Sequence, residues 1–344
     1  MKTRIKKALG IAVAAIVALP LAGLAYLYAA FPKVPPPSDV KVQATPALVE
    51  RGAYLANSVA ICMDCHTTRD WTRFSGPTVP GTHGKGGERF GPEIGLPGTL
   101  YASNITPAAL GDWSDGELIR AITTGVSKDG RALFPLMPYP AFGSMCERDV
   151  NAIVAYLRTL PAIENEVPLS TLDFPLNLIV RTLPAPASPQ ACPSPEDGVA
   201  YGAYLTKMAA CVDCHTKSEA GTPLPGMQFA GGVEFPLPTG GVVRTANLTP
   251  DVETGLGAWT KQMFVARFRA HADPSAEPGV GPGQFNTVMP WTQYGTMTEQ
   301  DLGAIYDYLR TLAPVNNRVE RFTPPEARHV AGSPKEAGEL ARAK

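Results

Sequence analysis

Apolar side chains recur every three or four residues in two matched segments of the chain. They are Val150, Ile153, Val154 and Leu157 in the first segment, and Leu302, Ile305, Tyr306 and Leu309 in the second. This spacing places them on one face of a helix, so each segment is predicted to be a helix that packs on a core. Thr298 is the expected N-cap of the second helix, with Asp301 three residues on, as in a capping box. Another helix is predicted over 46–59, with Thr45 as N-cap and Pro46 in its first turn.

The longest apolar stretch lies near the N-terminus. Residues 8–31 form an uncharged run of 24 residues, which is long enough to cross a membrane as a helix. Basic side chains precede it at Lys2, Arg4, Lys6 and Lys7, which predicts the N-terminus inside and the following chain outside. A cleaved signal peptide is the alternative, although its apolar region is usually only about 7–15 residues long. Residues 1–31 are therefore expected to be a retained transmembrane anchor, and residues 32–46 a proline-rich spacer.

Composition narrows the class of protein. A chain of 344 residues, with 44% hydrophobic and 18% charged residues, is typical of a globular protein of two ordinary domains. The net charge of −1 gives no basic surface for nucleic acid, so no nucleic-acid partner is expected. The 35 prolines and 33 glycines exceed average usage, which predicts long loops between the helices.

The chain contains an internal repeat, because several short motifs occur twice in the same order. These are Gly-Ala-Tyr-Leu at 52–55 and 202–205, Asn-Ile-Thr-Pro at 104–107 and Asn-Leu-Thr-Pro at 247–250, Trp113 and Trp259, Met137-Pro138 and Met289-Pro290, and Tyr-Leu-Arg-Thr-Leu at 156–160 and 308–312. The order predicts two tandem copies of one domain. Their expected bounds are residues 47–162 and 197–314, with a proline-rich linker at 163–196 and a polar, mobile tail at 315–344.

Each copy carries the pentapeptide Cys-x-x-Cys-His. The first comprises Cys62, Cys65 and His66, and the second Cys211, Cys214 and His215. This spacing is the signature of covalent haem c attachment, in which both cysteines form thioethers and the histidine ligates the iron. Zinc knuckles and thioredoxin-like redox sites are the alternatives, but paired zinc motifs usually lie about 15–20 residues apart. Here 149 residues separate them, so two haem c groups are predicted.

The second axial ligand of each iron is predicted to be the matched methionine, Met137 in copy one and Met289 in copy two. Each precedes a proline, which favours extended backbone and a loop that presents the side chain. Met145 and Met297 are also matched, but they precede the last helices and are expected to pack as hydrophobic staples. The remaining candidates are the unmatched histidines His83, His271 and His329, of which His83 and His271 are expected to be exposed loop residues.

Two cysteines remain outside the haem motifs. Cys146 occupies the position of the N-cap Thr298 in the other copy, and Cys192 lies near the end of the linker. A disulfide between them is expected if the chain is exported, and would hold the linker against the first domain. Two unpaired buried thiols are the alternative.

With these motifs in view, the sequence resembles class I cytochromes c, and its tandem arrangement is similar to the cytochrome c subunits of membrane-bound bacterial alcohol, aldehyde and gluconate dehydrogenases. The resemblance covers about 47–160 and 198–313 and implies all-α domains with His–Met haems. It implies electron transfer between a dehydrogenase or quinol oxidoreductase and a terminal acceptor such as an oxidase. Those subunits typically carry three haems and this chain has two motifs, so the family's partner does not carry over.

The expected place of the protein is the bacterial cytoplasmic membrane, with both haem domains on the periplasmic side and one N-terminal anchor. No catalytic residue is predicted, since electron transfer requires no acid–base group. A dihaem enzyme, such as a cytochrome c peroxidase or a thiosulfate dehydrogenase, is the alternative, and a haem-based sensor is a third. The copies differ most in two insertions, up to residue 95 in copy one and at 272–284 in copy two, which are expected to govern partner docking.

Overall fold

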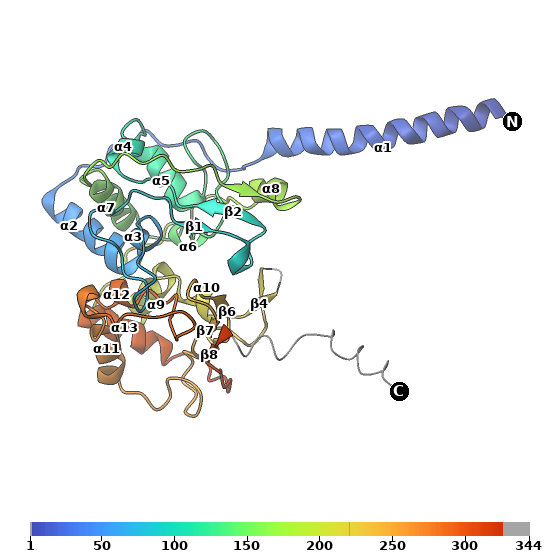
Figure 1. The fold of residues 1–344 in the computed structure, drawn as a ribbon. Coiled ribbons are helices and arrows are strands. Elements are labelled where there is room, and N and C mark those ends of the chain that lie inside the picture. Colours follow the sequence, from blue (N-terminus) through green and yellow to red (C-terminus); the bar gives the residue numbers. More distant parts are fainter. Residues whose placement is uncertain (1, 220, 326–344) are drawn as a thin grey trace, which may run out of the picture. The chain divides into compact units, whose positions relative to one another are not determined.

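The computed structural model describes residues 2–219 and 221–325, which are mainly helical with short strands (Figure 1). The α-helices are α1 (Lys2–Ala30), α2 (Pro46–Tyr54), α3 (Cys62–Cys65), α4 (Pro107–Leu110), α5 (Asp115–Thr124), α6 (Tyr139–Phe142), α7 (Glu147–Leu157), α8 (Leu176–Ile179), α9 (Gly198–Met208), α10 (Cys211–His215), α11 (Lys261–Arg269), α12 (Trp291–Tyr294) and α13 (Glu299–Leu309). A π-helical turn η1 (Leu55–Val59) and the 3-10 turns η2 (Pro92–Ile94), η3 (Val180–Thr182) and η4 (Pro274–Ala276) accompany them. The strands are β1 (Arg89–Phe90), β2 (Gly98–Tyr101), β3 (Thr171–Leu172), β4 (Ser218–Glu219), β5 (Thr222–Pro223), β6 (Glu234–Pro236), β7 (Val242–Arg244) and β8 (Phe322–Thr323).

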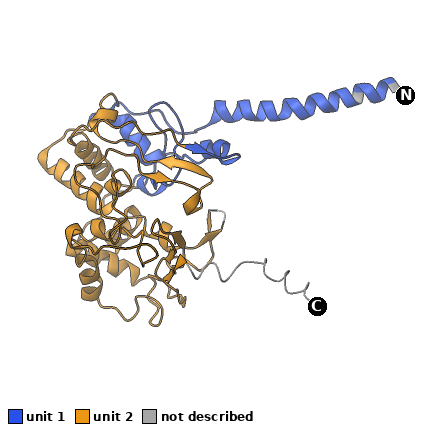
Figure 2. Ribbon diagram, viewed as in Figure 1, with its two compact units in different colours: residues 1–41, 113–144, 171–189 blue, residues 42–112, 145–170, 190–344 orange. Residues whose placement is uncertain are grey.

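The chain folds as two compact units (Figure 2). Unit 1 comprises residues 1–41, 113–144 and 171–189, and unit 2 comprises residues 42–112, 145–170 and 190–344. Both Cys-x-x-Cys-His motifs lie in unit 2. The tryptophan helix and methionine turn of copy one lie in unit 1, together with the apolar N-terminal helix.

Unit 1 contains α1, which is long and apolar enough to cross a membrane. Within Thr3–Ala30 an 18-residue window has a mean hydropathy of 2.4, and none of that window is buried. The proline-rich spacer after α1 lies so close to α5 that a Cβ on Gly116 would stand 1.9 Å from the Ser38 carbonyl oxygen. Arg181 of the linker donates a hydrogen bond of 2.6 Å to the Phe31 carbonyl and lies over the Tyr28 ring.

Unit 2 is built on the same helix pair twice, α2 against α7 and α9 against α13. Each pair crosses at a glycine, because a Cβ on Gly52 would stand 1.8 Å from the Ala152 carbonyl oxygen. On Gly202 it would stand 1.9 Å from that of Ala304. Only hydrogen fits at such a crossing, so the repeated Gly-Ala-Tyr-Leu motif is explained by backbone contact. The predicted helices over 46–59, 147–157 and 299–309 are confirmed, the first continuing through η1.

The predicted caps are present, with one difference. Thr45 accepts a hydrogen bond from the Leu48 N–H, and Thr298 accepts one from the Asp301 N–H. The Asp301 carboxylate does not complete the expected capping box, because it accepts hydrogen bonds from Tyr54 and Tyr201 instead. The Asp301 carboxylate therefore takes part in the contact between the two copies.

The cysteine and tail predictions have different outcomes. Cys146 and Cys192 form a disulfide that closes a separation of 46 residues, as expected. The start of the expected mobile tail is instead structured, since β8 pairs antiparallel with β7 through Val243 and Phe322. Asn317 also donates a hydrogen bond of 2.8 Å to the Ala230 carbonyl. Copy two therefore extends to this strand, while residues 326–344, including His329, lie outside the described residues.

Candidate haem-attachment sites

A residue with left-handed backbone precedes each Cys-x-x-Cys-His motif. Ile61 and Ala210 adopt left-handed conformations, with φ of 43° and 51°, and each immediately precedes a short helix. In α3 the His66 N–H donates a 3.0 Å hydrogen bond to the Cys62 carbonyl, closing one helical turn. Residues three and four apart share a helix face, so both sulfurs and the imidazole of a motif are presented to the same side. Left-handed backbone is uncommon for residues other than glycine, and its use at both motifs marks a required geometry.

A backbone carbonyl orients each motif histidine. His66 Nδ1 lies 2.6 Å from the Ser103 carbonyl oxygen, and His215 Nδ1 lies 2.8 Å from that of Ala246. A carbonyl oxygen only accepts hydrogen bonds, so each Nδ1 carries the proton and each Nε2 keeps its lone pair for a metal. Burial lowers the pKa of His215 to about 4 and also lowers that of His66, so both imidazoles are neutral at pH 7.

The repeated Asn-x-Thr-Pro segments explain how those carbonyls are fixed. Asn104 Oδ1 accepts hydrogen bonds from the N–H and Oγ1 of Thr106, at 2.9 and 2.8 Å. Asn247 and Thr249 form the same pair of bonds at the same distances. The amide nitrogens of the two asparagines donate to the Ile163 and Val315 carbonyls, both at 2.8 Å. Each Asn-x-Thr-Pro turn directly follows the residue whose carbonyl orients the histidine. In the sequence, the only sign of this role was that the motif occurs twice.

The thiols suit thioether formation better than a zinc site. Desolvation raises the pKa of Cys62, Cys65 and Cys211 to about 12, so these unmodified thiols are protonated. Within residues 2–219 and 221–325, no three His, Cys, Asp or Glu side chains converge as metal ligands. The donor set therefore fits haem c, with two sulfurs and one free imidazole nitrogen on one face of each motif.

The matched methionines occupy equivalent turns. Met289 is partly buried, and its carbonyl accepts a 2.8 Å hydrogen bond from the Trp291 N–H at the start of α12. Met137 is also partly buried, and its carbonyl accepts a 2.7 Å bond from the Tyr139 N–H at the start of α6. Met289 belongs to unit 2, as does His215, whereas Met137 belongs to unit 1. Iron ligation by either methionine remains a prediction. Met145 and Met297 are both 1% exposed, as expected for packing residues.

The expectation that His271 is an exposed loop residue is wrong. Its side chain is 13% exposed and is stacked on Phe74, with ring centroids 5.6 Å apart. It also lies against Trp291, at 5.1 Å, and its Nδ1 is 2.7 Å from a buried oxygen of Glu277. The aromatic neighbours come from distant parts of the sequence, so no local pattern predicted this burial. His83 is partly buried.

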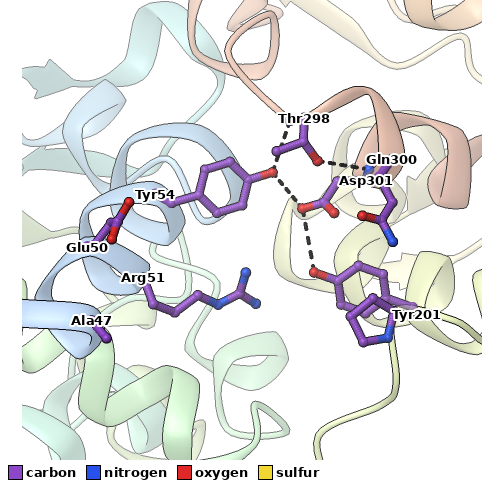
Figure 3. A pocket seen from close by; sticks show the side chains of 9 residues that line it. Ala47, Glu50, Arg51, Tyr54, Tyr201, Thr298, Gln300 and Asp301 are labelled. Atoms are coloured by element: carbon purple, nitrogen blue, oxygen red, sulfur yellow. Dashed lines mark hydrogen bonds between the residues drawn. The ribbon is translucent and has the colours of Figure 1, made fainter.

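Within unit 2 the two copies meet through a reciprocal pair of contacts. Tyr54 of copy one donates to Asp301 of copy two, and Tyr204 of copy two donates to Asp149 of copy one, at 2.5 and 2.9 Å. Each tyrosine comes from the first helix of its copy and each aspartate from the last helix of the other. Tyr54, Thr298 and Asp301 line a surface hollow of about 390 Å³ (Figure 3).

One half of this contact carries an ion pair. Arg51 donates hydrogen bonds of 3.2 and 2.8 Å to the two oxygens of Asp149. Burial alone would raise the pKa of Asp149, but the Arg51 hydrogen bond and charge outweigh it and lower that pKa. The two contacts are thus reciprocal, but one contains an ion pair and in the other tyrosine hydroxyls donate to the carboxylate.

Comparison with known proteins decides the class of the second copy. Residues 199–313 match the cytochrome c family. This part of the chain is a cytochrome c domain. Its Cys-x-x-Cys-His motif is repeated at 62–66. There, too, a left-handed residue precedes a short helix, and a backbone carbonyl orients the histidine.

The chain is similar to cytochrome c subunits of several dehydrogenases. It is 32% identical over 287 residues to the alcohol dehydrogenase (quinone) cytochrome c subunit of Gluconacetobacter polyoxogenes, covering 78% of this chain and 57% of that protein. It is 28% identical over 302 residues to the gluconate 2-dehydrogenase cytochrome c subunit of Pantoea cypripedii, covering 82% and 63%. A diheme c-type cytochrome of Cereibacter sphaeroides is 28% identical over 119 residues, covering 34% and 38%. The chain thus spans little more than half the length of the dehydrogenase subunits that match first.

Proposed function

We propose that this chain is a membrane-anchored dihaem c-type cytochrome that passes electrons between a dehydrogenase or quinol oxidoreductase and a terminal acceptor. The supporting observation is that one compact unit holds two complete attachment motifs, each with its histidine Nε2 left free by a fixed Nδ1–H. The similarity to cytochrome c subunits of alcohol and gluconate dehydrogenases supports the partner class.

When bound, haem c supplies a one-electron couple, the iron alternating between ferric and ferrous states. His66 and His215 would hold the iron on one side, and Met137 and Met289 are proposed to ligate it on the other. Thioether ligation opposite histidine raises the haem potential, which suits transfer toward a terminal acceptor.

The contacts between the two motifs support a relay within the chain. Ser58 Oγ, just before the first motif, lies 2.7 Å from Thr296 Oγ1 in copy two. Tyr294 of α12 donates a 2.6 Å hydrogen bond to the Ala209 carbonyl, two residues before the second motif. Helix α12 packs on η1, so it connects the segments that lead into both motifs. We infer that electrons pass between the two haems without leaving the protein.

The membrane part of the proposal rests on α1. Its apolar span is unburied, and the basic residues at its start favour the haem domains on the outer side. Deletion of residues 2–31 should release the protein from membranes, which fractionation of a periplasmically targeted form would detect.

Spectroelectrochemical titration of the full chain in detergent tests the proposal. Two low-spin transitions at positive potential are expected, with the near-infrared sulfur-to-iron band present for both haems. A high-spin iron that binds peroxide or cyanide readily would contradict it and favour a dihaem enzyme.

A further inference from the structure

The segment after the first haem motif lies against the methionine loop of the second copy. We call residues 69–78 the 69–78 loop and residues 286–291 the Met289 loop. The Phe74 N–H donates a 2.9 Å hydrogen bond to the Pro278 carbonyl, and the Val280 N–H donates one of 2.7 Å to the Thr72 carbonyl. Arg73 adds hydrogen bonds of 2.6 and 2.8 Å to the Ser275 and Glu277 carbonyls. The 69–78 loop of copy one is therefore hydrogen-bonded to the segment that leads to Met289.

Ser75 contacts the Met289 loop at its centre. Its Oγ donates a 2.6 Å hydrogen bond to the Met289 carbonyl and accepts one of 3.0 Å from the Trp291 N–H. Its own N–H donates a 2.8 Å bond to Asn286 Oδ1. Ser75 and Asn286 are both 0% exposed, so no water replaces these bonds.

The conformation of Ser75 is itself unusual. Its φ of 64° is left-handed, which is unfavourable for a residue other than glycine. Such backbone persists where its surroundings over-determine it, and here they bring Oγ to the Met289 carbonyl. Gly76, which follows, has φ of 53° and no room for a Cβ, which would stand 2.8 Å from the Trp71 ring.

A chain of hydrogen bonds fixes Ser75 to the first haem motif. Arg69 donates to the Ser75 carbonyl at 2.6 Å, to the Gly76 carbonyl at 2.8 Å and to Asp64 Oδ2 at 2.9 Å. Asp64 stands between the two cysteines of the first motif. Arg69 and Asp64 are buried, with side chains 7% and 6% exposed, so the connection is rigid as well as short.

We propose that Ser75 is a positioning residue for Met289, so that the first haem domain holds the axial ligand loop of the second. The inference rests on the proposed function, in which Met289 ligates the second iron. Without the Ser75 hydroxyl, the Met289 loop keeps its own turn bond but loses the two bonds to Oγ. The loop should then open more often, with the first haem unaffected.

Cyanide binding to the ferric full-length protein tests this, because cyanide enters only when the methionine leaves. Wild-type kinetics should show two phases, each removing part of the near-infrared sulfur-to-iron band. Met289→His abolishes the band of the second haem alone and so assigns the phases. Ser75→Ala should accelerate the second-haem phase about 5- to 30-fold, the range expected for losing one or two kcal/mol, and leave the first unchanged.

Two further variants keep the test decisive. Ser75→Gly removes the hydroxyl and relieves the left-handed backbone, so it should fold and show the same selective acceleration. Thr72→Ala is the matched control, because its exposed hydroxyl donates to Asp70 within the 69–78 loop.

Each outcome bears on a different claim. Unchanged kinetics in Ser75→Gly and Ser75→Ala, or equal acceleration of both phases, would overturn the positioning role. A wild-type second haem without the sulfur-to-iron band would instead overturn the assignment of Met289, before any serine variant is measured.

Discussion

The segments that follow the two haem motifs differ more than the motifs themselves. In both copies a threonine hydroxyl accepts a backbone hydrogen bond from the returning chain, at 3.2 Å for Thr67 and 3.0 Å for Thr216. A glycine N–H then donates to the motif histidine carbonyl, at 2.9 Å for His66 and 2.8 Å for His215. Between these fixed points copy one buries the 69–78 loop against copy two, whereas copy two forms the β4–β5 hairpin with exposed residues.

The difference shows which parts of a duplicated domain are constrained. The bonds that orient the motif histidine recur in both copies, as expected if each histidine must keep one fixed orientation. The segment between the threonine and the glycine makes none of these bonds. It contacts copy two in copy one, and it faces solvent in copy two. Strands β4 and β5 are exposed, whereas the 69–78 loop packs against copy two.

The strongest test concerns the glycines at the repeated helix crossings. Gly52→Ala and Gly202→Ala should each lower the free energy of unfolding by at least about 4–5 kcal/mol, because the new Cβ meets a backbone carbonyl at under 2 Å. Similar losses in thermal unfolding of the holoprotein would show that the two copies use one helix-packing device.

Gly303→Ala is the matched control, since its Cβ would first meet a flexible carbon of Lys261 at 3.4 Å. An alanine in a helix interior should there be neutral or stabilising by up to about 1 kcal/mol. If Gly52→Ala were as well tolerated as Gly303→Ala, the close crossing of α2 and α7 would be contradicted.

What the sequence predicts follows from how local each feature is. Helical periodicity, caps and the Cys-x-x-Cys-His spacing depend on neighbours within a turn or two, so α7, α13 and the motif helices could be predicted. The cysteine pair was also accessible, because repeat alignment showed Cys146 replacing a cap. Ser75 carried no such signal, since its role depends on Met289, 214 residues away. Burial of His271 likewise depends on Phe74, which is far away in the sequence. The pairing of β8 with β7 also joins segments that are distant in the sequence.

The disulfide sharpens the comparison, because only copy one has it. Replacing both Cys146 and Cys192 by alanine should lower the free energy of unfolding by about 3–4 kcal/mol, as the closed loop spans 46 residues. A second double variant with threonine at 146 and alanine at 192 supplies the N-cap hydroxyl found at Thr298 and should recover about 1 kcal/mol. Denaturant unfolding of both variants measures the difference. Equal stabilities would contradict the view that the cysteine replaced a cap.

The smallest expected effect compares Asp149, which pairs with Arg51, with Asp301, which accepts from tyrosines. Asp149→Asn should lower the free energy of unfolding by about 1–3 kcal/mol, since it leaves Arg51 without its carboxylate, and Asp301→Asn by about 1 kcal/mol, since its partners are tyrosines. The pKa of Asp149 lies below its ordinary 3.8 in the folded chain. Its contribution is therefore present above that value and lost as pH falls through the folded-state pKa. Wild type should converge on Asp149→Asn as the pH falls below 3.8 and through the folded-state pKa, when unfolding is followed from pH 7 downward. A difference between them that stayed constant over this range would show that Asp149 stabilises the contact by shape and not by charge.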